Sequence, residues 1–173
     1  METEINGVII ELRKGDISVQ EDIEAVVNAA NAELKTGGGV AGAIHRAAGP
    51  KLAEAGQKYA PIKPGEAVIT PAFNLPNEHV IHCLGPVYGR DKPEDKLLAS
   101  CYTEALKLAE EHGIKSVAFP AISTGAFGYP LEEAACQALE TVIKQTEELE
   151  VVKLIRFVLF DEQGLRTYRE ILS

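Results

Sequence analysis

The feature that most constrains the fold is a strand that leads through a glycine loop into a helix. An apolar, β-branched run at residues 25–27 ends in two amides, Asn28 and Asn31, and three consecutive glycines follow at 37–39. A segment of good helix propensity begins at residue 41. Three adjacent glycines cost backbone entropy and contribute no packing, so close approach to a ligand is favoured over a flexible turn. Ligands bind at the carboxyl ends of strands in open α/β sheets, where this loop would lie.

A second loop repeats this plan further along the chain. Residues 123–128 contain two hydroxyls, two glycines and an aromatic, and they precede a helix-starting Pro130. The start of a helix presents unpaired N–H groups that suit a phosphate. Two such loops predict a ligand with more than one phosphate, or a pyrophosphate. The alternative is a capped helix entry with Phe127 in the core, and the residues alone leave it open.

Strand-like and helix-like segments alternate along the whole chain, which predicts an α/β fold. This order indicates a three-layer α/β/α sandwich around a mixed sheet. At 173 residues, we expect a single domain spanning residues 1–173. The predicted strands are 7–12, 25–28, 67–70, 80–84, 116–119 and 152–160. The predicted helices are 41–48, with a continuation over 50–58, and 94–112, 131–144 and 162–172.

The charge balance excludes some classes of partner. The formal net charge is −9, and Lys and Arg form no dense run. General nucleic-acid binding and binding to an anionic membrane both rely on a basic surface, so neither is expected. A small phosphorylated ligand remains compatible, because backbone N–H groups hold phosphates without basic side chains. No apolar run is long enough to span a membrane, and the acidic N-terminus has no signal-peptide core, so a cytoplasmic protein is expected.

The cysteines and histidines do not predict a metal site. The three cysteines are widely separated and form no C-x-x-C pair, which favours buried, reduced thiols over a disulfide or a zinc site: Cys83, Cys101 and Cys136. His79 and His82 are three apart on a predicted strand and therefore lie on opposite faces. His45 lies within a predicted helix and is expected to be a structural, hydrogen-bonding residue.

Three polar residues near the predicted loops have more than one interpretation. Of Asn28 and Asn31, one is expected to fix the turn by bonding the backbone, and the other to bond a ligand hydroxyl. Asn31 is nearer the glycines and is therefore predicted to contact the ligand. Asp16 follows the first predicted strand and is either an ordinary turn or N-cap residue or an acceptor for the exocyclic amine of adenine. The residues leave both roles of Asp16 open.

Five motifs in combination resemble the macro domain family, over essentially the whole chain. The motifs are Val26–Asn31, Gly37–Val40, Ala43–Gly49, His82–Pro86 and Ala118–Gly125. The resemblance implies an α/β/α sandwich with a mixed six- or seven-stranded sheet and a cleft for ADP-ribose at its crest. It implies no cofactor and no metal, and its expected partner is ADP-ribose or an ADP-ribosylated protein.

The resemblance also implies roles for particular residues. Asp16 would bond the adenine amine, the Ile17 backbone would bond an adenine ring nitrogen, and Phe160 would stack on the base. Asn31 would bond the distal ribose. Two groups of residues would line the phosphates and the distal ribose: Gly38, Gly39 and Val40 in the first loop, and Ser123, Thr124, Gly125, Ala126 and Phe127 in the second.

Two functions from different classes follow from the resemblance. The first is a hydrolase that releases ADP-ribose from mono-ADP-ribosylated acidic side chains, or acetate from O-acetyl-ADP-ribose, with Asn31 and Gly38 as the catalytic positions. The second is a reader that binds ADP-ribose without chemistry. In one hydrolase branch of the family an aspartate follows the Gly-Val pair, and here that position is Ala41, which has no acid–base capacity. A substrate-assisted water attack is therefore the expected mechanism, with slower turnover, and the enzyme is favoured over the reader.

Overall fold

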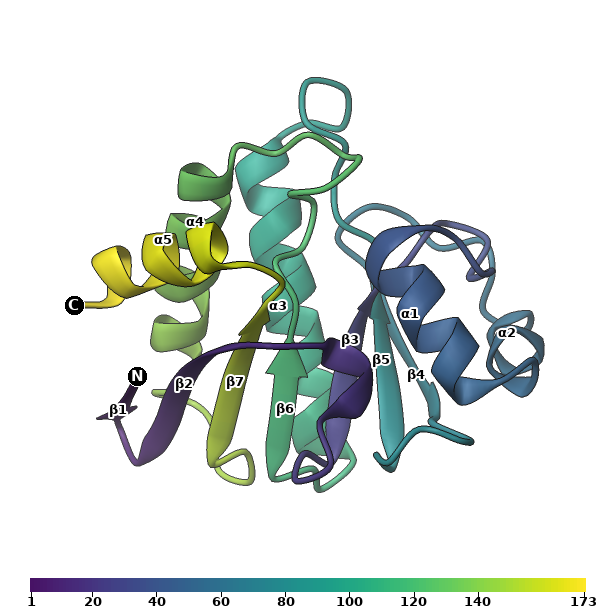
Figure 1. Cartoon of the computed structure of the whole chain (residues 1–173), viewed down its shortest axis with the longest axis horizontal. Helices are drawn as coiled ribbons and strands as arrows, with labels where there is room; N and C mark the ends of the chain where they lie inside the picture. The colour runs from purple at the N-terminus through teal and green to yellow at the C-terminus, as the bar shows by residue number, and fades with distance from the viewer.

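The computed structural model describes residues 1–173 and contains one mixed sheet of seven strands in the order β1-β2-β7-β6-β3-β5-β4 (Figure 1). Strands β2, β7, β6, β3 and β5 run parallel, while the two edge strands, β1 and β4, are antiparallel to their neighbours. The strands are β1 (Glu2–Ile5), β2 (Val8–Lys14), β3 (Ala25–Ala29), β4 (Ala67–Pro71), β5 (His79–Cys83), β6 (Ser116–Phe119) and β7 (Leu154–Leu159).

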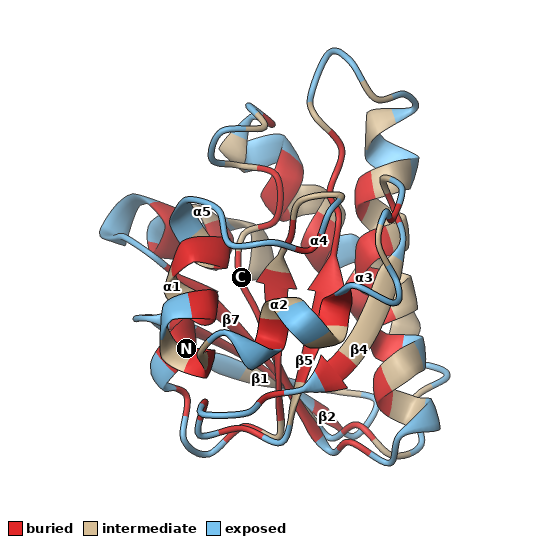
Figure 2. Ribbon diagram, turned by 90° about the vertical axis from the view of Figure 1, so that its right-hand side faces the viewer, coloured by how far each residue is buried: buried red, intermediate tan, exposed pale blue.

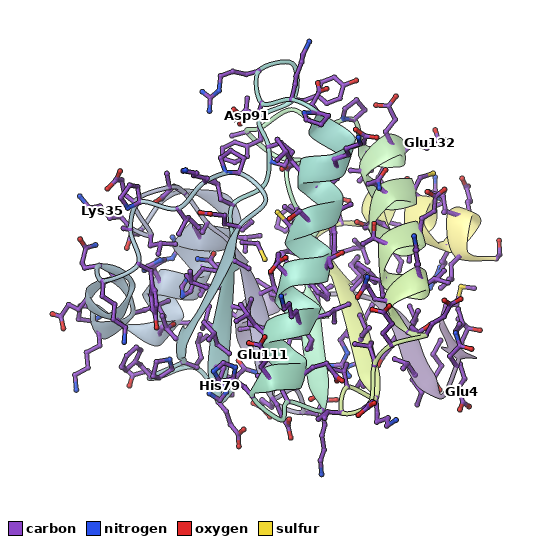
Figure 3. All side chains as sticks on the ribbon, turned by 180° about the vertical axis from the view of Figure 1, so that it is seen from behind. Glu4, Lys35, His79, Asp91, Glu111 and Glu132 are labelled. Carbon is purple, nitrogen blue, oxygen red and sulfur yellow. The ribbon has the colours of Figure 1, made fainter.

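Helices cover both faces of this sheet and complete the predicted three layers. One face carries α3 (Glu94–Glu111), α4 (Leu131–Gln145) and α5 (Glu162–Leu172), and Figure 3 shows α3 and α4 side by side across the sheet. The other face carries α1 (Gly39–Ala48), α2 (Lys51–Gly56) and a short 3-10 helix, η1 (Ile17–Val19). Because both faces are covered, the central strand β6 is buried throughout, and most of β5 is likewise buried, as its red colour in Figure 2 shows.

Two hydrophobic cores of unequal size hold the layers together. The core beneath α3, α4 and α5 has 29 buried residues and includes the aromatic group of Tyr102, Phe119, Phe157 and Tyr168. The core beneath α1, α2 and η1 has 11 buried residues, among them Ile44. Successive residues of one strand serve opposite cores, since side chains alternate across a sheet. The α1 side is therefore the more thinly packed layer, and it is the one that carries the glycine loop.

The predicted fold class is confirmed, with differences at the ends of elements. Helix α1 begins at Gly39, two residues before the predicted start, so the last glycine belongs to the helix. Strand β1 was not predicted, because its short sequence Glu-Thr-Glu-Ile is polar and half exposed and pairs only with β2. Helix η1 is a single turn and was also not predicted. No helix combines the length and the apolar character needed to cross a membrane.

Candidate functional site

The predicted site residues converge on one edge of the sheet, at the carboxyl ends of the parallel strands (Figure 1). The segment 15–17 follows β2, the glycine loop follows β3, the loop 120–130 follows β6, and Phe160 follows β7. Parallel strands end at a common edge, so these four segments meet although they are far apart in sequence. The sequence prediction that both glycine-containing loops share one ligand thus has a geometric basis.

The N-terminus of α1 presents backbone N–H groups that have no acceptor within the protein. Gly38 is the N-cap residue and offers no side-chain cap, and the first turn has no acidic residue. The first backbone bond runs from the Gly42 N–H to the Gly38 carbonyl at 3.2 Å, so the N–H groups of Gly39, Val40 and Ala41 have no acceptor within the protein. These free donors, together with the positive end of the helix dipole, favour a negatively charged ligand group.

Helix α1 lies directly on the glycine loop, and Gly42 makes this possible. A Cβ atom at residue 42 would lie 2.5 Å from the Gly37 carbonyl oxygen and 2.9 Å from Nη1 of Arg46. Any larger residue would push the helix from the loop, so Gly42 is a packing position beside the predicted site that the sequence prediction missed. Its only signal in the sequence was a glycine inside a predicted helix, where glycine is unfavourable without a packing reason.

The second loop presents a row of free backbone donors. Its shape is held by the Tyr129 N–H, which donates to the Ser123 carbonyl at 2.9 Å, and by the Thr124 hydroxyl, which donates to the Ala121 carbonyl at 3.0 Å. No acceptor in the protein is bonded to the four N–H groups from Thr124 to Phe127. Consecutive free N–H groups in a turn form a concave anion site.

The core packing considered for Phe127 is partly realised, and its contact with a ligand stays a prediction. Its ring is half buried and packs on a cluster of four buried side chains: Ala30, Leu34, Ile62 and Leu84. Leu34 belongs to the segment that precedes the glycine loop, so Phe127 joins the two loops. Its carbonyl also accepts a hydrogen bond from the Tyr88 N–H at 2.9 Å, which ties the loop after β5 to the same assembly.

Asn31 and Asn28 divide their roles differently from the prediction. The Asn31 amide bonds the Lys35 backbone at both ends, donating from Nδ2 to the carbonyl at 2.8 Å and accepting from the N–H at 3.0 Å. Asn31 therefore fixes the turn, the task expected of the other amide. One N–H and one lone pair of Asn31 remain free, so a ligand contact is still possible, and it stays a prediction.

Asn28 instead belongs to a buried polar chain below the loops. Its Nδ2 lies 3.1 Å from Nδ1 of His82, and Nε2 of His82 lies 2.9 Å from Oγ1 of Thr70. Burial, with a smaller contribution from the neighbouring His45, lowers the pKa of His82 to about 3, so its imidazole is neutral. Burial also lowers the pKa of His45, whose Nε2 has no hydrogen-bond partner in the protein. The hydrogen-bonding role predicted for His45 is thus not found at this nitrogen.

The segment after β2 lies beside the end of β7. The Gly15 N–H donates to the Leu159 carbonyl at 3.0 Å, which places Asp16 next to Phe160, whose side chain is 92% exposed. Oδ1 of Asp16 accepts from the Ser18 hydroxyl at 2.6 Å and from the Ser18 N–H at 2.8 Å. These two bonds lower the pKa of Asp16, and they leave Oδ2 free. The N-cap role of Asp16 is therefore confirmed, and it leaves an oxygen for a ligand.

No group of three or more His, Cys, Asp or Glu side chains has an arrangement that could hold a metal ion.

Two positions besides Gly42 were missed by the sequence prediction. Ser18 could have been found, because a hydroxyl two residues after an aspartate suits a local turn. Gly85 lies in the motif His82–Pro86 but was given no role: a Cβ atom there would lie 2.1 Å from Oγ of Ser123, so the second loop packs directly on its backbone.

Comparison with known proteins identifies relatives of the whole chain. The family model described as Macro domain matches residues 27–138. The O-acetyl-ADP-ribose deacetylase of Enterobacter cloacae is 44% identical over 169 residues, which cover 95% of this chain and 93% of that protein. The Oceanobacillus iheyensis macrodomain solved with ADP has a TM-score of 0.94 and 41% identity, covering 99% of this chain and 94% of that one. The Trypanosoma brucei macrodomain solved in complex with ADP-ribose has a TM-score of 0.87 and 36% identity, covering 95% and 67%.

Proposed function

The chain belongs to the macro domain family, and we propose that it binds ADP-ribose at the carboxyl edge of its sheet and hydrolyses ADP-ribose esters. The observation that carries the proposal is the pair of loops with unbonded N–H groups, at the start of α1 and at residues 124–127. Two anion sites joined through Phe127 match the two phosphates of a pyrophosphate. Similarity to macrodomains solved with ADP and with ADP-ribose supports the same ligand.

The adenosine half of the ligand would lie at the ends of β2 and β7. Phe160 offers an exposed aromatic face for the base, and Oδ2 of Asp16 is free to accept from the exocyclic amine. The N–H of Ile17 has no acceptor within the protein and is free to donate to a ring nitrogen. From there the pyrophosphate would pass between the two loops, so that the distal ribose reaches Asn31 and Gly38.

Hydrolysis at the distal ribose would be substrate-assisted. Ala41 is buried beside the glycine loop and has no group that could take a proton. With an acidic side chain esterified at C1″, a water held between a ligand phosphate oxygen and the backbone near Gly38 would attack C1″ of the distal ribose. In this reaction the proton of the water would pass to the phosphate oxygen, and the acidic side chain would leave as a carboxylate. With O-acetyl-ADP-ribose acetylated on another ribose hydroxyl, the same water would attack the acetyl carbonyl, acetate would leave, and the ribose hydroxyl would be regenerated. The free N–H groups of both loops would stabilise the charge that develops, as preorganised donors do.

The substrates proposed are esters of ADP-ribose: mono-ADP-ribosylated acidic side chains, O-acetyl-ADP-ribose, or both. The similarity to an O-acetyl-ADP-ribose deacetylase, 44% identical over nearly the full length of both chains, supports this class of substrate.

The experiment that tests the proposed function is to incubate the protein with a protein substrate mono-ADP-ribosylated on glutamate, and separately with O-acetyl-ADP-ribose. Release of ADP-ribose or acetate is followed, and calorimetric titration of ADP-ribose is run in parallel. Binding with release of either product supports the hydrolase.

One observation favours a second function. The apolar side chain of Ala41 stands where one hydrolase branch of the family has an aspartate, and Ala41 is 5% exposed. A protein that only reads ADP-ribose would need the binding residues and no base. Binding of ADP-ribose without release from either ester would establish the reader. Absence of binding would contradict both functions.

A further inference from the structure

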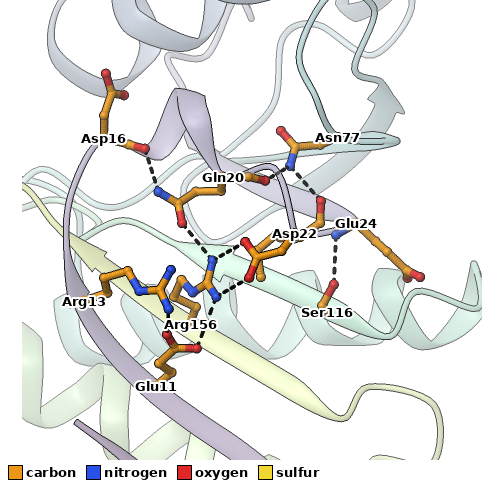
Figure 4. A network of polar contacts seen from close by, with 10 residues as sticks. Glu11, Arg13, Asp16, Gln20, Asp22, Glu24, Asn77, Ser116 and Arg156 are labelled. Carbon is orange, nitrogen blue, oxygen red and sulfur yellow. Dashed lines mark hydrogen bonds and ion pairs between the residues drawn. The ribbon is translucent and has the colours of Figure 1, made fainter.

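A buried polar network lies behind the segment proposed to read adenine, and no part of the proposed function uses it (Figure 4). Arg156 of β7 lies at its centre and is 2% exposed. Its guanidinium donates to both carboxylate oxygens of Asp22, at 2.8 and 2.7 Å, and to Oε2 of Glu11 at 3.2 Å. A buried cation with two carboxylates needs a structural or functional explanation, because taking charges out of water is costly.

The network reaches the adenine segment through one side chain. Nη1 of Arg156 also donates to Oε1 of Gln20 at 2.9 Å, and Nε2 of Gln20 donates to the main-chain carbonyl of Asp16 at 2.8 Å (Figure 4). Gln20 is itself buried, and Asn77 donates to its main-chain carbonyl at 2.7 Å. Because Arg156 can only donate, it orients the Gln20 amide with its oxygen toward the guanidinium and its NH₂ toward Asp16.

This contact determines the direction of a neighbouring donor. The carbonyl of Asp16 and the N–H of Ile17 belong to one planar trans peptide, so they point in opposite directions. The carbonyl is held by the Gln20 amide and by the Val19 N–H at 3.2 Å. The Ile17 N–H, which is free, is therefore aimed away from the interior network and toward the site. A rotation of this peptide plane would misalign it.

We infer that Gln20, oriented by Arg156, is a positioning residue for purine selectivity, because it aims the Ile17 N–H at the ring nitrogen of adenine. The inference rests on the proposed function, since it requires that the base of ADP-ribose lies at Ile17. Adenine presents an acceptor at this ring nitrogen, whereas hypoxanthine presents an N–H donor there. A well-aimed donor discriminates between the two bases, and a misaligned donor does so less.

The test is the ratio of the dissociation constants of ADP-ribose and its hypoxanthine analogue, measured by calorimetry. Gln20→Glu keeps the length of the side chain and its contact with Arg156, but it places an oxygen against the Asp16 carbonyl. We expect the selectivity ratio to fall roughly fivefold to tenfold, the effect of one hydrogen bond. Gln20→Met removes both polar contacts and is expected to lower the ratio similarly, should the glutamate variant fail to fold.

The matched control is Asp22→Asn. This variant weakens the ion pair of Arg156 but leaves the bond from Gln20 to Asp16 in place. It is expected to lower the temperature of unfolding while the selectivity ratio stays at the parent value. A purely structural role for the network predicts the opposite pattern, in which the ratio follows stability and not the Gln20 contact.

The outcomes separate the inference from the proposed function. A parent protein that binds ADP-ribose, with an unchanged ratio in both Gln20 variants, would overturn the inference alone. A parent that does not bind ADP-ribose would overturn both. In the parent, hydrogen exchange of the Ile17 N–H should slow on addition of ADP-ribose, and no slowing would also overturn the inference.

Discussion

The Asn31 amide fixes the turn before the glycine loop, and it is also the side chain expected to contact the distal ribose during hydrolysis. Its two bonds to the Lys35 backbone hold the segment before the glycines and orient the free edge of the amide. We expect Asn31→Ala to reduce ester hydrolysis about a hundredfold, since the variant loses a preorganised group at the distal ribose. Kinetics of ADP-ribose release, with circular dichroism to confirm folding, measure this. Asn74→Ala, at an exposed position, is the control, and full activity of the Asn31 variant would place the distal ribose elsewhere.

Substitution of Ala41 tests whether the absence of a general base limits the proposed hydrolysis. The residue is buried and its Cβ lies 3.8 Å from where a Cβ on Gly37 would be, so a carboxylate introduced there would reach the glycine loop. We expect Ala41→Asp to raise hydrolysis about tenfold, a modest part of what a general base contributes. Ala41→Asn has the same shape without the base and should show no gain. Equal rates in the two variants would favour the phosphate-activated water.

His82 makes stability depend on pH in a known direction. Its folded pKa of about 3 lies below the unfolded value of 6.5, so the unfolded chain binds a proton that the folded protein excludes. The stabilising effect of a neutral His82 is complete above pH 6.5 and is lost as the pH falls toward 3. The loss is on the order of 1 kcal/mol per pH unit in this window. Urea unfolding of the parent and of His82→Gln should show a shallower dependence in the variant. The control is His112→Gln, at an exposed position, whose free energy of unfolding should depend on pH as that of the parent does. An identical pH dependence in all three proteins would show that His82 is not its source.

Helices and strands with a strong apolar periodicity could be predicted from the sequence. A strand that forms only because it pairs with its neighbour could not. All of β3, β6 and α5 lie within a residue of their predicted ends, because burial of their apolar faces defines them. β1 has no apolar pattern and exists through its pairing with β2.

For the candidate site, the sequence motifs indicated which loops lie together at the carboxyl edge of the sheet. They did not indicate that Asn31 bonds Lys35, because this contact depends on a loop in which Leu34 adopts a positive φ of 56°.

The packing of α1 on the glycine loop is an element-scale contact that a single methyl group can test. Gly42→Ala gains helix propensity of about 1 kcal/mol but places Cβ 2.5 Å from the Gly37 carbonyl oxygen, which belongs to the backbone and yields little. We expect a net loss of stability of roughly 1 kcal/mol and weaker ADP-ribose binding, measured by thermal unfolding and calorimetry. Gly15→Ala meets only ordinary contacts, at 3.7 and 3.8 Å, and should leave stability almost unchanged. Unchanged stability and binding in the Gly42 variant would show that the helix and loop separate freely.

Over the whole molecule, the net charge has the same sign as the proposed ligand, so the protein and the ligand repel each other at long range. The chain carries a net charge of −9, and the site proposed for the pyrophosphate consists of backbone N–H groups and the start of a helix. Such donors act over short distances, whereas the overall negative field repels an anion at long range. This distribution of charge would favour a small diphosphate over nucleic acid, because the overall negative field would repel a ligand that carries many phosphates.

This balance predicts an unusual salt dependence for a phosphate ligand. Raising NaCl from about 50 mM to about 500 mM screens the long-range repulsion, because the Debye length falls from about 14 Å to about 4 Å. We expect the affinity for ADP-ribose to stay level or to rise by less than about threefold, as measured by calorimetry. Glu148→Lys, at an exposed position on the turn before β7 and away from the site, should raise affinity slightly at low salt, and the difference should vanish at high salt. A steep fall in affinity with salt would mean that basic side chains such as Arg46, and not the two loops, hold the pyrophosphate.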